Sequence, residues 1–357
     1  MDDKVSNQNR RKLLQALGVG TVVAGAASIT QPAQAASKLK TSAHIVILGS
    51  GLGGIAMANR LSNMLDGAKI TIVDGKEEHN YQPGYTLVAS GVWPVEKVRD
   101  RNADFHPSGI TWVKEMVAEI DAPANTITTS GGQKIKYDYL VVATGLVMDW
   151  NLIEGMDLNA IGSNGLASVY PSPQAAEATW KAMQEYVSKG GQAVMTLPAT
   201  ALKCAGAPLK MTFMVCDRLK RAGMLDKAQV MFKSGVKNIF GVKAVNDNVL
   251  ARWEEFGVKT DYESKLVGVD IGGRKAYFET PAGRVEQAYD FLHAVPPMRA
   301  PDAVKNSDLA WKEGPMAGGG WLEVDKATLQ HKRYPNVFGI GDVNGTPRGK
   351  TAATVKK

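Results

Sequence analysis

The feature that most constrains the fold is a strand, a glycine-rich loop, a helix and a second strand ending in an acid. An apolar strand is expected at His44–Leu48, followed by Gly49–Gly54, which reads G-S-G-L-G-G and matches G-x-G-x-x-G. Helical periodicity covers Ile55–Met64, and a second apolar strand, Lys69–Val73, leads directly to Asp74. Because all parts stand at the required spacing, the segment predicts a dinucleotide-binding βαβ unit rather than an incidental glycine-rich turn.

Four residues of this unit have predicted roles. Gly49 makes the tight turn, Gly51 lets the backbone approach a pyrophosphate, and Gly54 permits close packing of helix and strand. The helix N-terminus faces the phosphates, and Asp74 can accept a hydrogen bond from a ribose hydroxyl. These roles suit FAD and NAD equally, so other segments must decide the cofactor.

Two later segments favour FAD. Tyr137–Gly145 is an apolar strand ending in A-T-G, and Asn336–Asp342 is another ending in G-D. The order and spacing of the three motifs resemble the flavoproteins with two dinucleotide-binding domains. The resemblance implies an α/β fold with two Rossmann-like domains, like that of glutathione reductase, and a bound FAD whose ribityl chain contacts the acid of the G-D pair. The implied contacts in these two segments are Thr144, Gly145, Gly341 and Asp342.

Composition indicates a globular protein large enough for two domains. Of its 357 residues, 44% are hydrophobic and 22% charged, which argues against a disordered, collagen-like or coiled-coil chain. The net charge of +7 comes from scattered basic residues, which favours solubility over an anionic membrane surface or substrate, and we expect no nucleic-acid partner. Two cysteines are too few for a disulfide scaffold, and the dispersed histidines predict no metal site.

The first 35 residues have the pattern of an export signal. Arg10-Arg11 is followed by K-L-L, a mildly apolar stretch runs over Leu13–Ile29, and Ala33–Ala35 is an A-x-A cleavage site. The arginine pair resembles a twin-arginine signal, a route that exports folded proteins with their cofactor already bound. A short membrane anchor is the alternative, but a spanning helix needs about 20 apolar residues. We therefore expect a periplasmic protein, and a position peripheral to the membrane stays open.

The middle of the chain is expected to form a second domain without a nucleotide-binding loop. Ala175–Ser188 has the periodicity of a helix, and Gln192–Thr196 has the pattern of a first strand. In relatives that use NADH, a second G-x-G-x-x-G follows this strand, whereas Leu197–Pro208 reads L-P-A-T-A-L-K-C-A-G-A-P. Because this loop offers no phosphate cradle and proline removes an N–H donor, the sequence argues against a nicotinamide nucleotide as electron donor.

These observations divide the chain into four expected segments. They are a signal peptide, the first part of an FAD-binding domain, a second Rossmann-like domain and a return to the FAD-binding domain. Their predicted ranges are 1–35, 41–154, 155–290 and 291–357.

The loop of the middle domain contains a candidate nucleophile. Cys204 stands just before a helix that is expected to begin near Pro208, because proline is favoured at a first helical position. A thiol near a helix N-terminus and beside Lys203 favours the reactive thiolate. The alternative is a buried structural cysteine, since free cysteines are often buried.

At this loop the resemblance becomes specific to the sulfide:quinone oxidoreductases. Lys203–Pro208 looks like the K-C-A-G-A-P segment of that family. Three further stretches resemble the family as well. They are His79–Val88, Val295–Pro301, and Tyr334–Asp342 with Lys350–Ala353 after it.

The resemblance implies a reaction and two catalytic residues. In that family a cysteine persulfide reacts with the flavin, electrons pass to a quinone, and sulfide leaves as polysulfide or sulfane sulfur. Cys204 takes the place of that cysteine. Lys350 takes a place near the pyrimidine side of the flavin, where a cation could stabilise reduced-flavin charge, or it is a surface lysine.

The chain departs from the family at the second redox cysteine. In the most similar branch this cysteine follows the G-D pair directly, but here the position holds Val343. Cys216 is a poor substitute, because twelve helical residues separate it from Cys204 by up to about 18 Å. A disulfide needs Cα atoms within about 7 Å, so Cys216 is expected to pack in a core with Met211 and Val215. Either Cys204 works with an external sulfur acceptor, or sulfide is not the substrate.

A second departure is the end of the sequence. The chain stops at Thr354–Lys357, within the expected helix beneath the flavin, whereas family members continue with a segment that helps form the quinone pocket and the membrane contact. The expectation is a fold with a truncated C-terminal part, whose membrane contact depends on that segment.

Three other readings stay open at this stage. The chain could be the flavoprotein subunit of a flavocytochrome c sulfide dehydrogenase-like complex with a cytochrome c partner, although it has no C-x-x-C-H of its own. It could also be an inactive FAD-binding fragment. An NADH dehydrogenase shares the fold but is disfavoured by the missing second glycine loop. A homo-oligomer is compatible with all of them.

Overall fold

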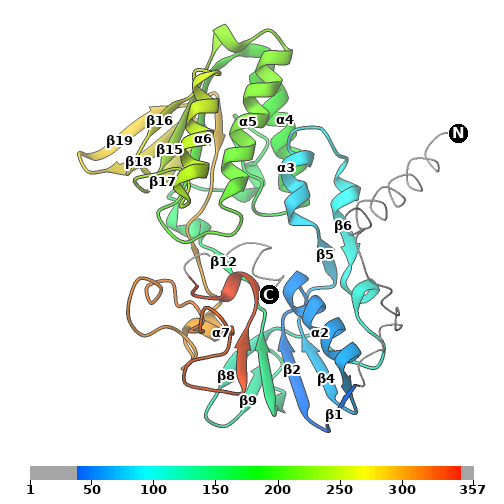
Figure 1. The fold of residues 1–357 in the computed structure, drawn as a ribbon. Coiled ribbons are helices and arrows are strands. Elements are labelled where there is room, and N and C mark those ends of the chain that lie inside the picture. Colours follow the sequence, from blue (N-terminus) through cyan, green and yellow to red (C-terminus); the bar gives the residue numbers. More distant parts are fainter. Residues whose placement is uncertain (1–37, 347–357) are drawn as a thin grey trace, which may run out of the picture. The chain divides into compact units, whose positions relative to one another are not determined.

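The computed structural model describes residues 38–346, and these fold around two parallel β-sheets of five strands each. Figure 1 shows the first sheet in the lower part of the view and the second in the upper part, with helices packed against both. This confirms the α/β class with two Rossmann-like units that the motifs predict.

The first sheet carries the three predicted flavin motifs on neighbouring strands. Its order is β22-β11-β2-β4-β7, and every pair is parallel. The strands are β22 Val337–Gly339, β11 Tyr139–Val142, β2 His44–Leu48, β4 Lys69–Val73 and β7 Thr111–Val113. The central strands are continuous apolar runs because a parallel sheet is buried on both faces. Helix α2 (Leu52–Met64) buries Gly54, Ile55 and Ala58.

The second sheet repeats this plan with the order β13-β20-β14-β15-β16, again all parallel. The strands are β13 Leu166–Ala167, β20 Phe291–His293, β14 Gly191–Leu197, β15 Ala228–Ser234 and β16 Lys259–Asp261. The helices of this part are α4 Pro173–Lys189, α5 Gly206–Arg221 and α6 Lys243–Glu254. Helix α4 begins at Pro173, two residues before the predicted start at Ala175, and Ser172 caps it by accepting from the N–H of Ala175 at 3.1 Å.

Smaller elements complete the described part of the chain. One antiparallel sheet of three strands consists of β8 Val117–Asp121, β9 Thr126–Thr129 and β10 Lys134–Lys136. Another consists of β17 Lys265–Asp270, β18 Lys275–Thr280 and β19 Gly283–Ala288. The short pairs are β1 Leu39–Lys40 with β3 Leu65–Asp66, and β5 Glu78–Asn80 with β6 Arg99–Arg101. The short helices include α3 Tyr85–Val88 and α7 Asp302–Lys305.

The chain passes between the two parallel sheets twice, and the two passages pair with each other. Strand β12 (Val147–Met148) lies antiparallel to β21 (Met298–Arg299). Beside them the guanidinium of Arg299 donates to a carboxylate oxygen of Asp149 at 3.0 Å, with only 22% and 15% of the two side chains exposed. This partly buried ion pair holds the passages together and so sets how the two sheets meet.

The two sheets also share one hydrophobic core. A single cluster of buried side chains includes Leu48 of β2, Leu140 of β11 and Phe232 of β15. Residues 38–346 accordingly belong to one compact unit. The domain boundaries proposed from the sequence, including the signal peptide outside the described residues, stay predictions.

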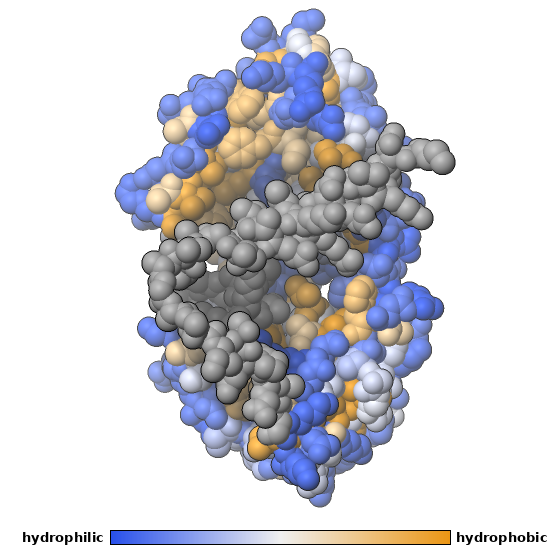
Figure 2. All heavy atoms as spheres, turned by 45° about the vertical axis from the view of Figure 1, so that its right-hand side comes forward, coloured by the Kyte–Doolittle hydropathy of each residue, from blue (hydrophilic) through white to orange (hydrophobic). Residues whose placement is uncertain are grey.

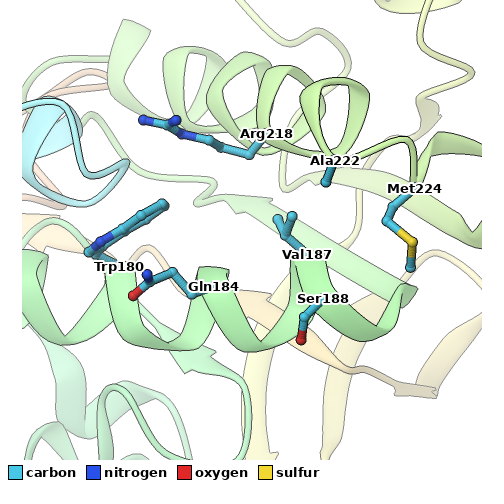
Figure 3. Close-up of a pocket in the computed structure, with 7 residues that line it drawn as sticks. All are labelled: Trp180, Gln184, Val187, Ser188, Arg218, Ala222 and Met224. Carbon is cyan, nitrogen blue, oxygen red and sulfur yellow. The ribbon is translucent and has the colours of Figure 1, made fainter.

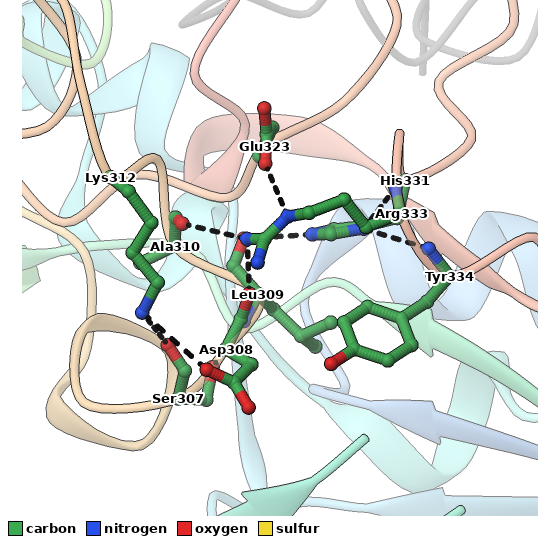
Figure 4. A network of polar contacts seen from close by, with 9 residues as sticks. All are labelled: Ser307, Asp308, Leu309, Ala310, Lys312, Glu323, His331, Arg333 and Tyr334. Atoms are coloured by element: carbon green, nitrogen blue, oxygen red, sulfur yellow. Dashed lines mark hydrogen bonds and ion pairs between the residues drawn. The ribbon is translucent and has the colours of Figure 1, made fainter. Parts of the chain in front are cut away.

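The strand that carries the G-D motif is held by a polar network around Arg333 (Figure 4). The Arg333 guanidinium donates to Glu323 at 2.9 Å and to the carbonyl oxygens of Asp308 and Ala310. Arg333 is one of the scattered basic residues, and its charged group binds oxygen atoms within the fold.

His331 completes this network in a fixed tautomer. Its Nδ1 accepts from the N–H groups of Arg333 and Tyr334, at 3.1 and 3.2 Å, so Nε2 carries the proton toward the carbonyl oxygen of Leu309 at 3.1 Å. Burial lowers the pKa of His331, which keeps the ring neutral. The turn before β22 is therefore held by short, directional contacts.

Two further helices, like α4, begin earlier than the sequence indicates. Helix α2 starts at Leu52 rather than Ile55, and α5 starts at Gly206 rather than near Pro208. Pro208 is the third residue of α5, where its missing N–H costs nothing because the first four N–H groups of a helix have no partner inside it.

The surface is mainly hydrophilic around the outline in Figure 2, with apolar patches inside it. Single exposed apolar side chains such as Leu52, 57% exposed, and Val92, 51% exposed, are common on soluble domains. Within residues 38–346, none of the helices has the length and apolar character needed to cross a membrane.

A pH prediction follows from His293 in β20, which is fully buried. Its Nε2 accepts from the N–H of Val169 at 3.4 Å, and burial lowers its pKa to about 3. The unfolded chain binds a proton near pH 6.5 that the folded chain excludes, so stability should fall as pH drops from 6.5 toward 3, by up to about 1.4 kcal/mol per pH unit from this group.

The measurement is urea unfolding of wild type and His293→Gln between pH 8 and pH 4.5. The variant should lose less stability on acidification, whereas the comparison at pH 8, where the histidine is neutral in both states, isolates the packing cost of the substitution. Equal acid sensitivity of the two proteins would contradict the prediction.

Candidate functional site

The glycine loop after β2 is packed so tightly that two of its glycines cannot be replaced without movement. Gly49 has φ +103° and donates its N–H to the carbonyl oxygen of Val73 at 2.9 Å. A Cβ on Gly54 would lie 1.9 Å from the carbonyl oxygen of Gly49, and one on Gly49 would lie 2.4 Å from that of Ala143. The predicted roles of these glycines in turn formation and close packing match this geometry.

The third glycine differs because the space beside it is open. Gly51 is the N-cap of α2, without a side-chain cap, and a Cβ there would meet nothing within 4 Å. The N–H groups of the first helical turn lack partners inside the helix and carry the positive end of its dipole. The arrangement leaves room for an anionic group such as a pyrophosphate to approach the backbone.

The carboxylate of Asp74 binds the backbone of the glycine loop. Its carboxylate accepts from the N–H of Ser50 at 2.6 Å and from that of Lys76 at 2.8 Å, and the side chain is buried. The Ser50 hydroxyl contacts Nε2 of His106 at 2.7 Å, and burial lowers the pKa of His106 against the opposing effect of Asp74. No local sequence pattern predicts the contact between Ser50 and His106, because these two residues are far apart in the chain.

The three predicted motifs meet at one edge of the first sheet. In register, Val142 of β11 lies between Leu48 of β2 and Gly339 of β22. The residues that follow these three positions therefore leave the carboxyl ends of adjacent parallel strands. This edge is where α/β sheets bind dinucleotides.

The residues at this edge fit FAD. The hydroxyl oxygen of Thr144 is buried and has no hydrogen-bond partner among residues 38–346, and the same holds for Thr346. A Cβ on Gly145 or on Gly341 would meet nothing within 4 Å. An unpaired buried hydroxyl and open backbone positions are what a cofactor with many polar groups requires.

Asp342 lies within electrostatic range of the loop that follows β14. It lies in the short helix Gly341–Val343 and is half-buried. Burial lowers the pKa of Lys203, and the nearby Asp342 carboxylate opposes that effect, while Lys76 adds to it. Lys203 is therefore a half-buried cation of this loop that interacts electrostatically with the motif containing Asp342.

Cys204 lies at the N-terminal end of α5, as predicted, and takes an unusual backbone conformation. Its φ is +47°, and its carbonyl oxygen accepts from the N–H of Ala207 at 2.8 Å. The residue is half-buried and is a free cysteine. The side chain is thus neither in a closed core nor fully in solvent.

Cys216 lies on α5 at full burial and is also free. It belongs to the same core cluster as Met211 and Val215, which confirms the packing role expected for it, and burial raises its pKa to about 12. Val343 is fully buried as well, and its carbonyl oxygen accepts from the N–H of Leu322 at 3.0 Å. The predicted catalytic residue Lys350 lies outside the described residues.

An open pocket of about 400 Å³ lies elsewhere, between α4 and α5 (Figure 3). Its lining residues are Trp180, Gln184, Val187, Ser188, Arg218, Ala222 and Met224. The Arg218 guanidinium lies 5.1 Å from the centre of the Trp180 ring and donates to the carbonyl oxygen of Ser90. None of the predicted site residues lines this pocket, so it is separate from the edge that carries the motifs.

Comparison with known proteins assigns a family to this arrangement. Residues 43–188 match the family described as pyridine nucleotide-disulphide oxidoreductase. The mitochondrial sulfide:quinone oxidoreductase of Dictyostelium discoideum is 38% identical, with 89% of this chain and 69% of the relative aligned. The mitochondrial sulfide:quinone oxidoreductase of Mus musculus is 37% identical, with 98% and 76% aligned.

A solved structure shares the fold. The sulfide:quinone oxidoreductase of Aquifex aeolicus superposes with a TM-score of 0.71 at 25% identity, covering 85% of this chain and 69% of that one. The likeness therefore extends through both parallel sheets.

The packing of the glycine loop yields a prediction about stability. Gly54→Ala forces a Cβ into the Gly49 carbonyl, so we expect a loss of about 1–3 kcal/mol or more in the free energy of unfolding. Gly51→Ala meets no atom within 4 Å, so the change should stay below about 1 kcal/mol. Urea unfolding of the flavin-free proteins measures both, and equal losses would show that the loop is not packed as described.

Proposed function

Because the chain belongs to the sulfide:quinone oxidoreductase family, we propose that it is an FAD-dependent enzyme that oxidises sulfide and reduces a quinone. The observation that carries the proposal is the loop Lys203–Pro208. It occupies the position of a second nucleotide loop but presents Cys204 just before α5, and the neighbouring Lys203 lies within electrostatic range of Asp342.

FAD would be held by the edge of the first sheet. Gly49, Gly51 and Gly54 would let the backbone of α2 bind the pyrophosphate, and Asp74 would bind a ribose. The remaining proposed contacts are Thr144, Gly145, Gly341 and Asp342. When bound, FAD supplies a group that accepts two electrons from the donor and passes them on.

The loop of the second sheet argues for a sulfur donor over a nicotinamide nucleotide. Its side chains and Pro198 occupy the place of a glycine cradle. At the end of β15, where nucleotide-binding domains place an acid for the ribose, the chain has Lys233 and Ser234. The Lys233 ammonium is buried and bonded to Asp261 at 2.6 Å, so that position serves the fold.

Cys204 is the proposed nucleophile, and its neighbours are the start of α5 and Lys203. Cys204 stands just before the N-terminus of α5, where the helix dipole is positive, and directly after Lys203. Because Val343 replaces the expected second cysteine, we propose that the sulfur taken from sulfide is carried as a persulfide on Cys204, with FAD as the acceptor of the two electrons, and passes to an external acceptor while the cysteine keeps its own sulfur. Lys350 is proposed to stabilise negative charge near the flavin.

The experiment is anaerobic reduction of the bound flavin, followed by its visible absorbance, with sulfide and NADH added separately. Sulfide should bleach wild type and NADH should not. Cys204→Ser should keep its flavin but lose the sulfide reaction by roughly 100-fold or more, as expected for loss of a nucleophile. Cys216→Ala, a change in the core, is the matched control and should still be bleached by sulfide.

Bleaching of Cys204→Ser by sulfide at the wild-type rate would reject Cys204 as the nucleophile. Bleaching of wild type by NADH would reject the proposal that the loop of the second sheet does not serve a nicotinamide nucleotide. The acceptor is tested by reoxidising the reduced enzyme with a water-soluble ubiquinone or with cytochrome c. Reoxidation by cytochrome c alone would favour a flavocytochrome-type subunit instead.

We further propose that the protein is exported to the periplasm through its arginine pair. Replacing Arg10 and Arg11 with lysine keeps the charge but removes the pair that the export route reads, so the variant should stay in the cytosol. Lys4→Arg is the control, and immunoblots of cell fractions give the distribution. An unchanged periplasmic yield of the double variant would reject this route.

A further inference from the structure

The backbone of Cys204 lies in a conformation that side chains rarely adopt. Among residues 38–346, six residues other than glycine have a positive φ, and two of them are asparagines, which tolerate it best. A residue of another type stays in this region only when its surroundings hold it there. The contacts around Cys204 show what holds it.

The first contact comes from Tyr170, which precedes α4. Its hydroxyl donates to the carbonyl oxygen of Cys204 at 3.3 Å, so this oxygen accepts from both Tyr170 and the N–H of Ala207. Tyr170 is 4% exposed, and burial raises its pKa well above the ordinary value of 10, so the hydroxyl stays protonated and remains a donor.

Tyr170 is itself held in place by the second sheet. Its N–H donates to the hydroxyl of Ser168 at 3.3 Å, and its ring centre lies 6.5 Å from that of His293 in β20. The neighbouring Val169 donates its N–H to the same histidine. The tyrosine is therefore a rigid part of the sheet rather than a mobile loop residue.

The second contact comes from Met298 in β21, on the passage between the two sheets. Its N–H donates to the hydroxyl of Thr200 at 2.9 Å, and its sulfur accepts from the N–H of Lys203 at 3.3 Å. The segment Val295–Pro301 was noted in the sequence only as a resemblance. The structure gives it a physical role, because it secures the loop just before Cys204.

We propose that Tyr170 is a positioning residue that holds Cys204 in its left-handed conformation and so directs its thiol, with Met298 securing the preceding loop. This inference rests on the role proposed for Cys204. In this role the Tyr170 hydroxyl acts on the backbone carbonyl of Cys204, and no contact of Tyr170 with substrate or cofactor is proposed.

The test compares Tyr170→Phe with Tyr186→Phe. Tyr186 is a matched control, because it is also buried and donates to carbonyl oxygens, those of Gly191 and Gln229, away from the loop. The readout is the rate at which iodoacetamide alkylates Cys204, measured by mass spectrometry of the Cys204 peptide in the flavin-loaded protein. Cys204→Ser is the blank.

Removing the Tyr170 hydroxyl should let the loop leave its strained conformation, so alkylation should become faster. At 3.3 Å the contact is long for a hydroxyl donor, so we expect a change of roughly 3- to 10-fold, as for one modest hydrogen bond. Flavin reduction by sulfide should become slower in the same variant. Tyr186→Phe should leave both rates unchanged.

An unchanged alkylation rate in Tyr170→Phe, or an equal change in Tyr186→Phe, overturns the proposal. If Tyr170→Phe does not fold, Met298→Leu keeps the size of the side chain, removes the sulfur acceptor and should also speed alkylation. No change there overturns the proposal in the same way. Alkylation needs neither sulfide nor quinone, so this result stands apart from a failure of the proposed reaction.

Discussion

The pairing of β12 with β21 is the constraint on which the candidate site depends. The chain leaves the first parallel sheet, forms the second sheet and returns to the first. The pairing of the two passages and the Asp149–Arg299 ion pair restrict the positions that the second sheet can take relative to the first. The same pairing fixes Met298, whose backbone and sulfur bind the loop before Cys204. The strand pairing at the junction of the two sheets therefore also secures the loop that precedes the thiol.

The two sheets carry similar strand–loop–helix units, for which different chemistry is proposed. After β2, glycines leave the backbone of α2 open, since a Cβ at Gly51 would meet nothing within 4 Å. After β14, side chains stand where a nucleotide would need bare backbone, and Cys204 precedes the start of α5. In each unit a helix N-terminus, which prefers negative charge, lies beside the residues proposed for the site.

The sequence predicts the sheet strands better than the helix starts, and the cause is physical. Strands β2 and β4 have the expected bounds because buried parallel strands are uninterrupted apolar runs. The N-cap residues of helices α2 and α5, Gly51 and Ala205, form no side-chain cap, so the usual signal is missing. The three flavin motifs are recognisable from local spacing, whereas the contacts of Tyr170, Met298 and His106 join residues 34 or more positions apart, which no local pattern encodes.

The contacts that hold Cys204 in place do not involve the sulfur atom that is proposed to react. A nucleophile that is held through its own side chain must give up those bonds before it can attack. Here the carbonyl oxygen of Cys204 and the N–H of Lys203 take the contacts, and none of these uses the sulfur. The strain of the left-handed backbone is offset by neighbours fixed in the second sheet and in the passage between the sheets. The direction of the thiol is thus set by the backbone, which leaves its sulfur available for bond formation.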